Sequence, residues 1–416
     1  MLHFATEKLL GGPNLMKTND TGDALITSTD QSIACLSVRF PLEFNFAYPN
    51  VQNLVRKQIE HHMRLCTVAT SGFEVLFSTV GSEPLLAEAA SHAMTINRTN
   101  PIRELSDIMD KNCINHGERG ELVAALLIMQ ARDAVTKGSE RRWVYVCEFM
   151  ESLLGTSAAT ATTFPCKIHS SKDWKSLGDR FKHARMWFNH VLKIRKAHLI
   201  NVQYLWEFIA RGAMILCANN QPGVDIVIPI HFSDNPLSRN NVTAILVQVK
   251  NDLTFGENMH SYLFDAMDPF HINLFNKDGN KGGKAPLPII RMVFALASEQ
   301  SAVKWSATVG SGRTTRQSER TDPYTSYDVW CAGISKDTFS VITDKGESDS
   351  YKKILDRTRF SGEEYSVSKI HGIEYPEYVA TRKAVLVRNF DALVTGEDLG
   401  LRSKGKSRQK GKQRAD

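Results

Sequence analysis

The sequence predicts an α/β protein in which a mixed central sheet is flanked by helices and preceded by a mainly helical region. Between residues 51 and 137, apolar residues recur at the spacing of an amphipathic helix. Between residues 213 and 335 the period changes, and short runs rich in Val, Ile and aromatic residues alternate with turn-forming segments. With 416 residues, of which 42% are hydrophobic, the chain is long enough to bury a sizeable core.

The helical region contains three well-marked segments. "NVQNLVRKQIEHHMRLC" begins at residue 50 and places its apolar residues on one helical face. "GSEPLLAEAASHAM" has Ser82 as the expected cap and Pro84 at the first helical position. "GERGELVAALLIMQARDAVTKG" is a long apolar helix that ends at Gly138.

The α/β region begins with a further helix, "INVQYLWEFIARG", which Gly212 stops. Five strands are expected after it: "AMILCA", "GVDIVIPI", "AILVQVK", "IIRMVFALAS" and "YDVWCAGIS". The first three are close enough in sequence to form a meander, and a partly helical crossover near 255–275 precedes the last two. The order is therefore a helix, three strands, a crossover and two strands.

These features divide the chain into six segments, with the small-residue stretch "TSAATATTF" as the best linker. The segments are a loose N-terminal lead-in (1–30), a mainly helical region (31–155), a linker and basic helix (156–199), the α/β core (200–345), a C-terminal helical extension (346–400) and a disordered basic tail (401–416).

Composition narrows the class of protein. No apolar run reaches the ~18 residues that a membrane helix needs, and the first residues do not resemble a signal peptide. The seven cysteines form no C-x-x-C pair, which disfavours a zinc knuckle or a disulfide framework. We therefore expect an intracellular protein, nuclear or cytoplasmic, without a membrane partner.

Positive charge is concentrated in two places, which is the pattern of a nucleic-acid-binding protein. The last sixteen residues contain seven Lys or Arg against one Asp, and residues 167–198 contain nine against two. In the second block four apolar residues recur at helical spacing, namely Phe181, Ala184, Phe188 and Val191. We expect the opposite helical face to contact phosphates or to be merely solvated; it would present Lys182, Arg185, Asn189, Lys193 and Lys196. A loop at 310–320 could add Arg313 and Arg316 as phosphate ligands.

Two of the expected strands carry polar residues that a buried strand should not contain. Asp225 opens one strand, and Gln248 and Lys250 share a face at the end of the next. If these strands pair antiparallel, the three side chains meet at one edge of the sheet. The Asp225 carboxylate, the Gln248 amide oxygen and the Val249 backbone carbonyl are hard ligands suited to Mg²⁺ or Mn²⁺. Lys250 could then orient a water or stabilise negative charge on a phosphate, or form a purely structural ion pair with Asp225.

The residues "GVD" at 223–225 and "QVK" at 248–250 resemble the motif of the PD-(D/E)xK, or restriction-endonuclease-like, nuclease superfamily. "GERGELVAALL", "CANNQPGVDIVIPI" and "AILVQVKND" resemble fungal proteins related to the nuclease-like domains of Crinkler effectors and retrotransposon hot-spot proteins. The resemblance implies a mixed sheet flanked by helices and metal-dependent cleavage of phosphodiesters. The two basic segments predict binding of nucleic acid that does not depend on its sequence. Gln248 departs from the usual Glu or Asp.

The superfamily usually adds a glutamate from the helix before the sheet, and two positions compete for that role. Glu207 lies among apolar residues in "QYLWEFIARG", where a carboxylate needs a partner, and Glu121 lies in the motif-like "GERGELVAALL". The residues favour Glu207 slightly. The competing function is an interaction protein or effector that retains the fold and binds nucleic acid without cleaving it.

Overall fold

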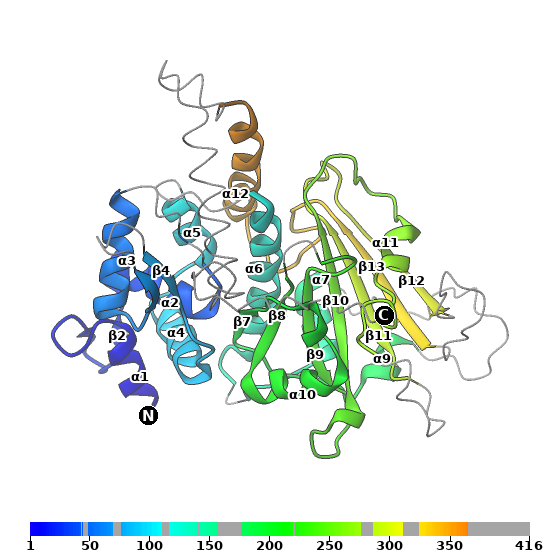
Figure 1. The fold of residues 1–416 in the computed structure, drawn as a ribbon, viewed down its shortest axis with the longest axis horizontal. Coiled ribbons are helices and arrows are strands. Elements are labelled where there is room, and N and C mark those ends of the chain that lie inside the picture. Colours follow the sequence, from blue (N-terminus) through cyan, green and yellow to red (C-terminus); the bar gives the residue numbers. More distant parts are fainter. Residues whose placement is uncertain are drawn as a thin grey trace, which may run out of the picture. The chain divides into compact units, whose positions relative to one another are not determined.

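The computed structural model describes most of the chain up to residue 364 (Figure 1). The described residues are 1–42, 44, 49–69, 76–109, 116–139, 141–155, 176–218, 221–275, 286–310 and 324–364. The chain forms two compact units, Met1–Asp356 and Arg357–Asp416, and the description below concerns the first. The expected boundaries near residues 155 and 199 therefore do not separate compact units.

The first 155 residues are mainly helical, as the sequence predicts. The helices are α1 (Leu2–Leu9), α2 (Thr29–Arg39), α3 (Pro49–His61), α4 (Pro84–Ile96), α5 (Pro101–Met109), α6 (His116–Thr136) and α7 (Val146–Leu154). Two small hairpins interrupt them: β1 (Lys17–Thr18) with β2 (Ala24–Leu25), and β3 (Leu65–Ala69) with β4 (Leu76–Thr79).

Two local expectations for this region were wrong. The lead-in is not loose, because it contains α1 and a hairpin, and the side chains of Leu9 and Leu10 are fully buried. Apolar burial therefore orders a segment whose sequence shows little periodicity. Pro84 does begin α4, but the cap position is Glu83, and Ser82 Oγ instead lies 2.8 Å from His190 Nε2.

The strands from residue 144 onward form a nine-stranded mixed sheet, which confirms the α/β class. Its strands are β5 (Val144–Tyr145), β6 (Arg185–Met186), β7 (His190–Lys193), β8 (Ala213–Leu216), β9 (Ile226–His231), β10 (Val242–Lys250), β11 (Ile289–Ala295), β12 (Ala302–Gly310) and β13 (Tyr324–Ala332). The main path runs β12-β13-β11-β10-β9-β6-β5, and β8 pairs with both β9 and β7.

The centre of this sheet has the predicted topology. Helix α10 (Val202–Arg211) leads into β8, and β8, β9 and β10 form an antiparallel meander. Helix α11 (Ser261–Ala266) lies in the crossover, and β11 then pairs parallel with β10 and with β13. The remaining elements are two short 3₁₀ turns, η1 (Ala197–Leu199) and η2 (Arg239–Asn241), and α12 (Lys345–Glu364).

The basic block does not form the expected helix. A short helix, α9 (Leu177–Phe181), is followed by β6 and β7. The four apolar residues Phe181, Ala184, Phe188 and Val191 are buried as expected. Pairing of β7 with β8 and of β6 with β9 achieves this burial instead of a helical face, so tertiary contacts override the local pattern.

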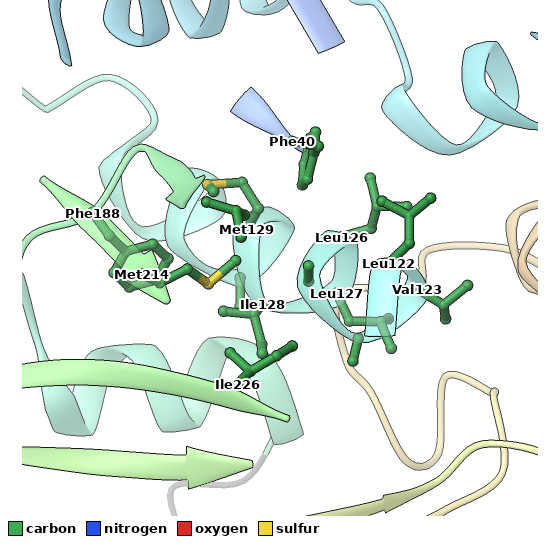
Figure 2. Packing of buried hydrophobic residues seen from close by; sticks show 14 of the residues in the cluster. Phe40, Leu122, Val123, Leu126, Leu127, Ile128, Met129, Phe188, Met214 and Ile226 are labelled. Carbon is green, nitrogen blue, oxygen red and sulfur yellow. The ribbon is translucent and has the colours of Figure 1, made fainter. Parts of the chain in front are cut away.

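The sheet separates two hydrophobic clusters because successive side chains of a strand point to opposite faces. On one face, Ile245 and Val247 of β10 join a cluster built on α6, and on the other, Ala244 and Leu246 join one that includes α10 and α11. Figure 2 shows the first cluster, in which Ile128 of α6 lies beside Ile226 of β9. In the described part of the chain, no helix combines the length and the apolar character needed to cross a membrane.

Candidate active site

Asp225 and Gln248 meet at the edge of the meander because β9 and β10 pair antiparallel. The pairing runs to Val247 opposite Ile226, and the Asp225 N–H donates to the Val247 carbonyl at 2.9 Å. One further step of this register places Asp225 opposite Gln248. The arrangement expected from the sequence is therefore confirmed at the level of the backbone.

The Asp225 carboxylate turns toward the main chain of β10. Its Oδ2 accepts a hydrogen bond from the Val249 N–H at 2.6 Å. Burial raises the pKa of Asp225 above its ordinary value, while this hydrogen bond and the positive charge of Lys250 lower it. Desolvation is the largest of these effects. The Val249 hydrogen bond and the Lys250 charge therefore offset only part of the cost of burying the ionised carboxylate.

Gln248 contributes an oxygen that the protein leaves unsatisfied. Its side chain is 7% exposed, and its Oε1 accepts no hydrogen bond from the described residues. A buried acceptor without a partner costs about 1–3 kcal/mol. Gln248 lies opposite Asp225 at the end of the β9–β10 pair. A cation bound there would offset the cost of burying both groups.

The Val249 carbonyl points to the same side of β10. In a strand, the N–H and C=O of one residue face one neighbour and those of the next residue face the other. The Val249 N–H faces Asp225, whereas the Lys250 carbonyl accepts from Leu296 N beyond β11. The Val249 carbonyl is therefore directed toward Asp225, as the predicted set of metal ligands requires.

Lys250 lies within electrostatic reach of the Asp225 carboxylate. It acts on the pKa of Asp225 through its charge, yet no ion pair joins the two side chains in the part of the chain that the structure describes. Its Nζ lies 5.7 Å from the centroid of the Phe255 ring. The structural Asp225–Lys250 ion pair that the sequence left open is thus not formed, and the ammonium remains beside the site.

The two candidate glutamates lie in different surroundings. Glu207 is exposed, because the buried residues of α10, Leu205, Phe208 and Ile209, occupy its other face. Sequence reasoning favoured Glu207 because a carboxylate among apolar neighbours needs a partner. Helical periodicity instead turns residue 207 to solvent, so that reason does not hold.

Glu121 lies at the same end of the meander as Asp225. Burial raises the pKa of the Cys217 thiol, and the negative charges of Asp225 and Glu121 add to this effect. Cys217 N donates to the Asp225 carbonyl at 2.8 Å. Gly120 also packs closely on β10, since a Cβ there would lie 3.3 Å from Val249 Cγ1. Gly120 thus places α6, and with it Glu121, against the end of β10 on the Val249 side, whereas Glu207 is exposed on α10.

Sequence reasoning missed two residues that shape this edge. Gly223 has a φ of +82°, and a Cβ on it would lie 2.1 Å from the Ala266 carbonyl oxygen, so only glycine fits between β9 and α11. Cys217 was noted only as one scattered cysteine. The pattern G-x-D before a strand could have indicated the glycine, whereas nothing in the sequence pointed to the thiol.

The candidate site can supply three oxygens of different kinds. Within the described ranges, no group of three or more His, Cys, Asp or Glu side chains is arranged to hold a metal ion. The donors that fit Mg²⁺ or Mn²⁺ are the Asp225 carboxylate, the orphaned Gln248 Oε1 and the Val249 carbonyl, which are hard oxygen ligands. Water would complete such a shell, since Mg²⁺ usually keeps several waters.

The predicted phosphate ligands do not lie on one helical face. Lys182 and Lys196 are exposed, and Lys193 is half-buried at the end of β7. Arg185 forms an ion pair with Asp234 and lies over the Trp143 ring.

Two further predictions for nucleic-acid contact have different outcomes. Asn189 is 1% exposed and donates to Glu88 Oε2 at 2.9 Å, so it cannot face a phosphate. Arg313 and Arg316 lie outside the described residues.

A family model matches more than half of the sequence. The model of a family described as a domain of unknown function (DUF8736) matches residues 28–300, about two thirds of the chain. No curated protein and no solved structure matches the sequence.

Proposed function

We propose that this protein, which belongs to the DUF8736 family, is a metal-dependent nuclease that hydrolyses phosphodiester bonds of DNA or RNA. The observation that carries the proposal is the orphaned Gln248 Oε1, buried beside the desolvated Asp225 carboxylate. A buried oxygen without a hydrogen bond next to a desolvated carboxylate destabilises the protein, and a bound cation would offset both costs. The nearby Lys250 ammonium makes this edge suitable for phosphate chemistry rather than for cation storage.

The order of the central elements supports the same proposal. An antiparallel meander, a helical crossover and a parallel strand follow one another from β8 to β11. The sequence resemblance to the restriction-endonuclease-like superfamily implies a mixed sheet flanked by helices, with the aspartate and the lysine on adjacent strands. Asp225 precedes β9 and Lys250 ends β10, which agrees with that placement.

Each residue of the site has a definite part in the proposed reaction. Asp225, Gln248 and Val249 would hold Mg²⁺ or Mn²⁺, which polarises a phosphate oxygen and lowers the pKa of a bound water. The Lys250 ammonium donates hydrogen bonds to the attacking water or to the phosphate oxygen that becomes more negative. Glu121 adds negative charge at the same end of the meander. Exposed Lys182 and Lys196 would contact phosphates independently of the nucleotide sequence. The protein would act in the nucleus or the cytoplasm.

A second candidate function is binding of nucleic acid without cleavage, as in an effector or a component of a mobile-element system. The observation that favours it is residue 248 itself, since an amide oxygen brings no charge to a cation. In this alternative the fold and the basic residues persist while the catalytic site has lapsed.

The proposed function predicts metal-dependent cleavage. Purified protein with Mg²⁺ or Mn²⁺ should shorten labelled DNA or RNA oligonucleotides, and EDTA should stop the reaction because the cation supplies both activation of water and charge neutralisation. Gel electrophoresis of the products provides the measurement, with EDTA followed by excess Mg²⁺ as the reversal control. Binding of both nucleic acids without cleavage under any of these conditions would leave the second candidate function in place.

Substitution of Gln248 distinguishes a weakly charged active site from a lapsed one. Gln248→Glu should tighten binding of Mg²⁺, because a second carboxylate joins Asp225 at the same edge. We expect a larger rise of Tm on adding Mg²⁺ than in the original protein, since a ligand that binds only the folded state stabilises it. Gln248→Leu, the matched apolar control, should reduce the rise. Equal Mg²⁺-dependent rises in all three proteins would contradict the assignment of residue 248 as a ligand.

A further inference from the structure

An aromatic cluster lies immediately after Lys250. The Phe255 and His260 rings are 5.5 Å apart, and the His260 and Tyr262 rings are 5.8 Å apart, both in edge-to-face geometry. His260 also lies 5.3 Å from the Trp330 ring of β13. Of these four residues Tyr262 is the most accessible, with 56% of its surface exposed, whereas Trp330 is fully buried. The cluster therefore runs from the buried Trp330 ring to the exposed Tyr262 ring.

The segment that carries these rings is held in place by polar contacts. Trp330 Nε1 donates to the Gly256 carbonyl at 3.0 Å, and Lys304 Nζ donates to Asn258 Oδ1 at 3.3 Å. On α11, the Phe264 carbonyl accepts from the guanidinium of Arg291 at 2.7 Å. Tyr262 thus lies on a fixed support, and a ligand that contacts its ring need not first order the loop.

Helix α11 is connected at its start to Lys250 and at its end to the residues just before Asp225. Its start is linked through His260 and Phe255 to Lys250, whose Nζ lies 5.7 Å from the Phe255 ring. Its end, at the Ala266 carbonyl, packs against Gly223, two residues before Asp225. Figure 1 shows α11 beside the sheet. A polymer whose phosphate lies at Asp225 and Lys250 therefore has this helix beside it.

Charge around the rings indicates which part of a nucleotide could lie there. Asp252, Glu257 and Asp265 are exposed on the same segment. Their negative charges repel phosphates but not an uncharged base. Stacking on an aromatic ring requires only the flat face of the base and contributes substantially to binding of single strands.

We propose that Tyr262 stacks against an unpaired base next to the phosphate that is cleaved, so that the preferred substrate is single-stranded nucleic acid. This inference rests on the proposed function, because it assumes that the phosphate lies beside Lys250. In a duplex each base is already paired and stacked between its neighbours, and its face is not available to Tyr262 unless it is extruded. Tyr262 thus favours substrates with unpaired bases. The oxygens of Asp225 and Gln248 would hold the cation that acts on the phosphate of the same strand.

Binding without metal tests this inference separately from cleavage. Fluorescence polarisation in EDTA would compare single-stranded DNA, single-stranded RNA, a duplex and an abasic strand that has the same phosphates and no bases. Tyr262→Leu should weaken binding of the base-containing single strands by about 5- to 150-fold, the range for the loss of one stacked base. Its affinity for the abasic strand should not change. Tyr262→Phe should bind as the original protein does, and Phe4→Leu, which removes an exposed ring on α1, is the matched control.

The outcomes separate the two proposals. Equal weakening on abasic and base-containing strands would mean that Tyr262 contacts the backbone, and this inference would fail. It would also fail if the original protein bound the duplex as tightly as the single strand, or if Tyr262→Leu had no effect. Tyr262-dependent binding in a protein that never cleaves would retain the stacking role and reject the nuclease, whereas a protein that binds no nucleic acid would reject both.

Discussion

Asp225→Asn should abolish cleavage while leaving the protein folded. The amide keeps the shape of the side chain and can still accept the hydrogen bond from the Val249 N–H. It removes the negative charge that a metal requires, so we expect a loss of at least about 10³-fold in rate, corresponding to several kcal/mol of transition-state stabilisation. The rate should be measured on a single-stranded oligonucleotide at saturating Mg²⁺. Retention of more than about a tenth of the activity would contradict the assignment of Asp225 as the anionic ligand.

The same variant should be at least as stable as the original protein at neutral pH. Since burial raises the folded-state pKa of Asp225, the folded protein holds its proton more tightly than the unfolded chain does. The contribution of Asp225 to stability is therefore fully present below the unfolded pKa and is lost as the pH rises through the folded value. The asparagine has no charge to bury, so this loss of stability does not occur in Asp225→Asn. The Tm of the variant should therefore exceed that of the original protein near pH 7, and the difference should shrink toward about pH 4. A lower Tm at both pH values would instead indicate a structural role.

Substitution of the two candidate glutamates in the same assay shows which of them belongs to the site. Glu207→Gln changes an exposed residue on the outer face of α10 and should leave the cleavage rate unchanged. Glu121→Gln should lower the rate, because in the proposed site Glu121 adds negative charge near the end of β10, on which α6 packs through Gly120. The reverse ranking would restore the assignment that the sequence favoured.

Arg291→Met should cause the largest loss of stability among the substitutions considered. Arg291 on β11 and Asp328 on β13 are 5% and 3% exposed and form a bidentate pair, with N···O distances of 2.7 and 2.6 Å. The methionine fills similar volume but removes the bidentate partner of a buried carboxylate. We expect the free energy of unfolding to fall by about 3–5 kcal/mol. Urea denaturation followed by circular dichroism gives the measurement.

The double substitution Arg291→Met with Asp328→Leu is the matched control for charge. It removes both charges, so it should recover part of the lost stability, although the hydrogen bond from Arg291 to the Phe264 carbonyl remains absent. A single Arg291→Met variant that loses less than about 1 kcal/mol would show that the pair does not stabilise the sheet. A double variant that is no better than the single one would place the cost in packing rather than in charge.

The centre of the sheet could be predicted from the sequence because its strands are continuous apolar runs. In β9 and β10 nearly every residue is buried on one face or the other, which leaves Asp225, Gln248 and Lys250 conspicuous at the ends. A short connection between the two strands favours antiparallel pairing, and this alone brings the ends together. The position of three candidate residues thus follows from local pattern and chain length.

Other features depend on contacts that a single sequence does not contain. The sequence did not predict β12, an edge strand that pairs only with β13 among the described strands and alternates apolar residues with Lys304 and Ser306. The apolar spacing of residues 181–191 fits a helix equally well, and only pairing with β8 and β9 decides for strands. Glu121 could not be preferred to Glu207 until the packing of α6 on the end of β10 was known.

The hydrophobic cluster on the α6 side of the sheet has a consequence for how the protein unfolds. It is continuous from Leu9 in α1 through α6 and the sheet to Leu355 in α12. The α6 side chains cover the inner residues of β8, β9 and β10. The strands that hold Asp225 and Gln248 therefore share their apolar burial with a helix that lies about a hundred residues earlier in the chain. Residues 1–356 should therefore behave as one cooperative folding unit, and a fragment limited to residues 200–345 would expose the sheet face that α6 covers and be prone to aggregation.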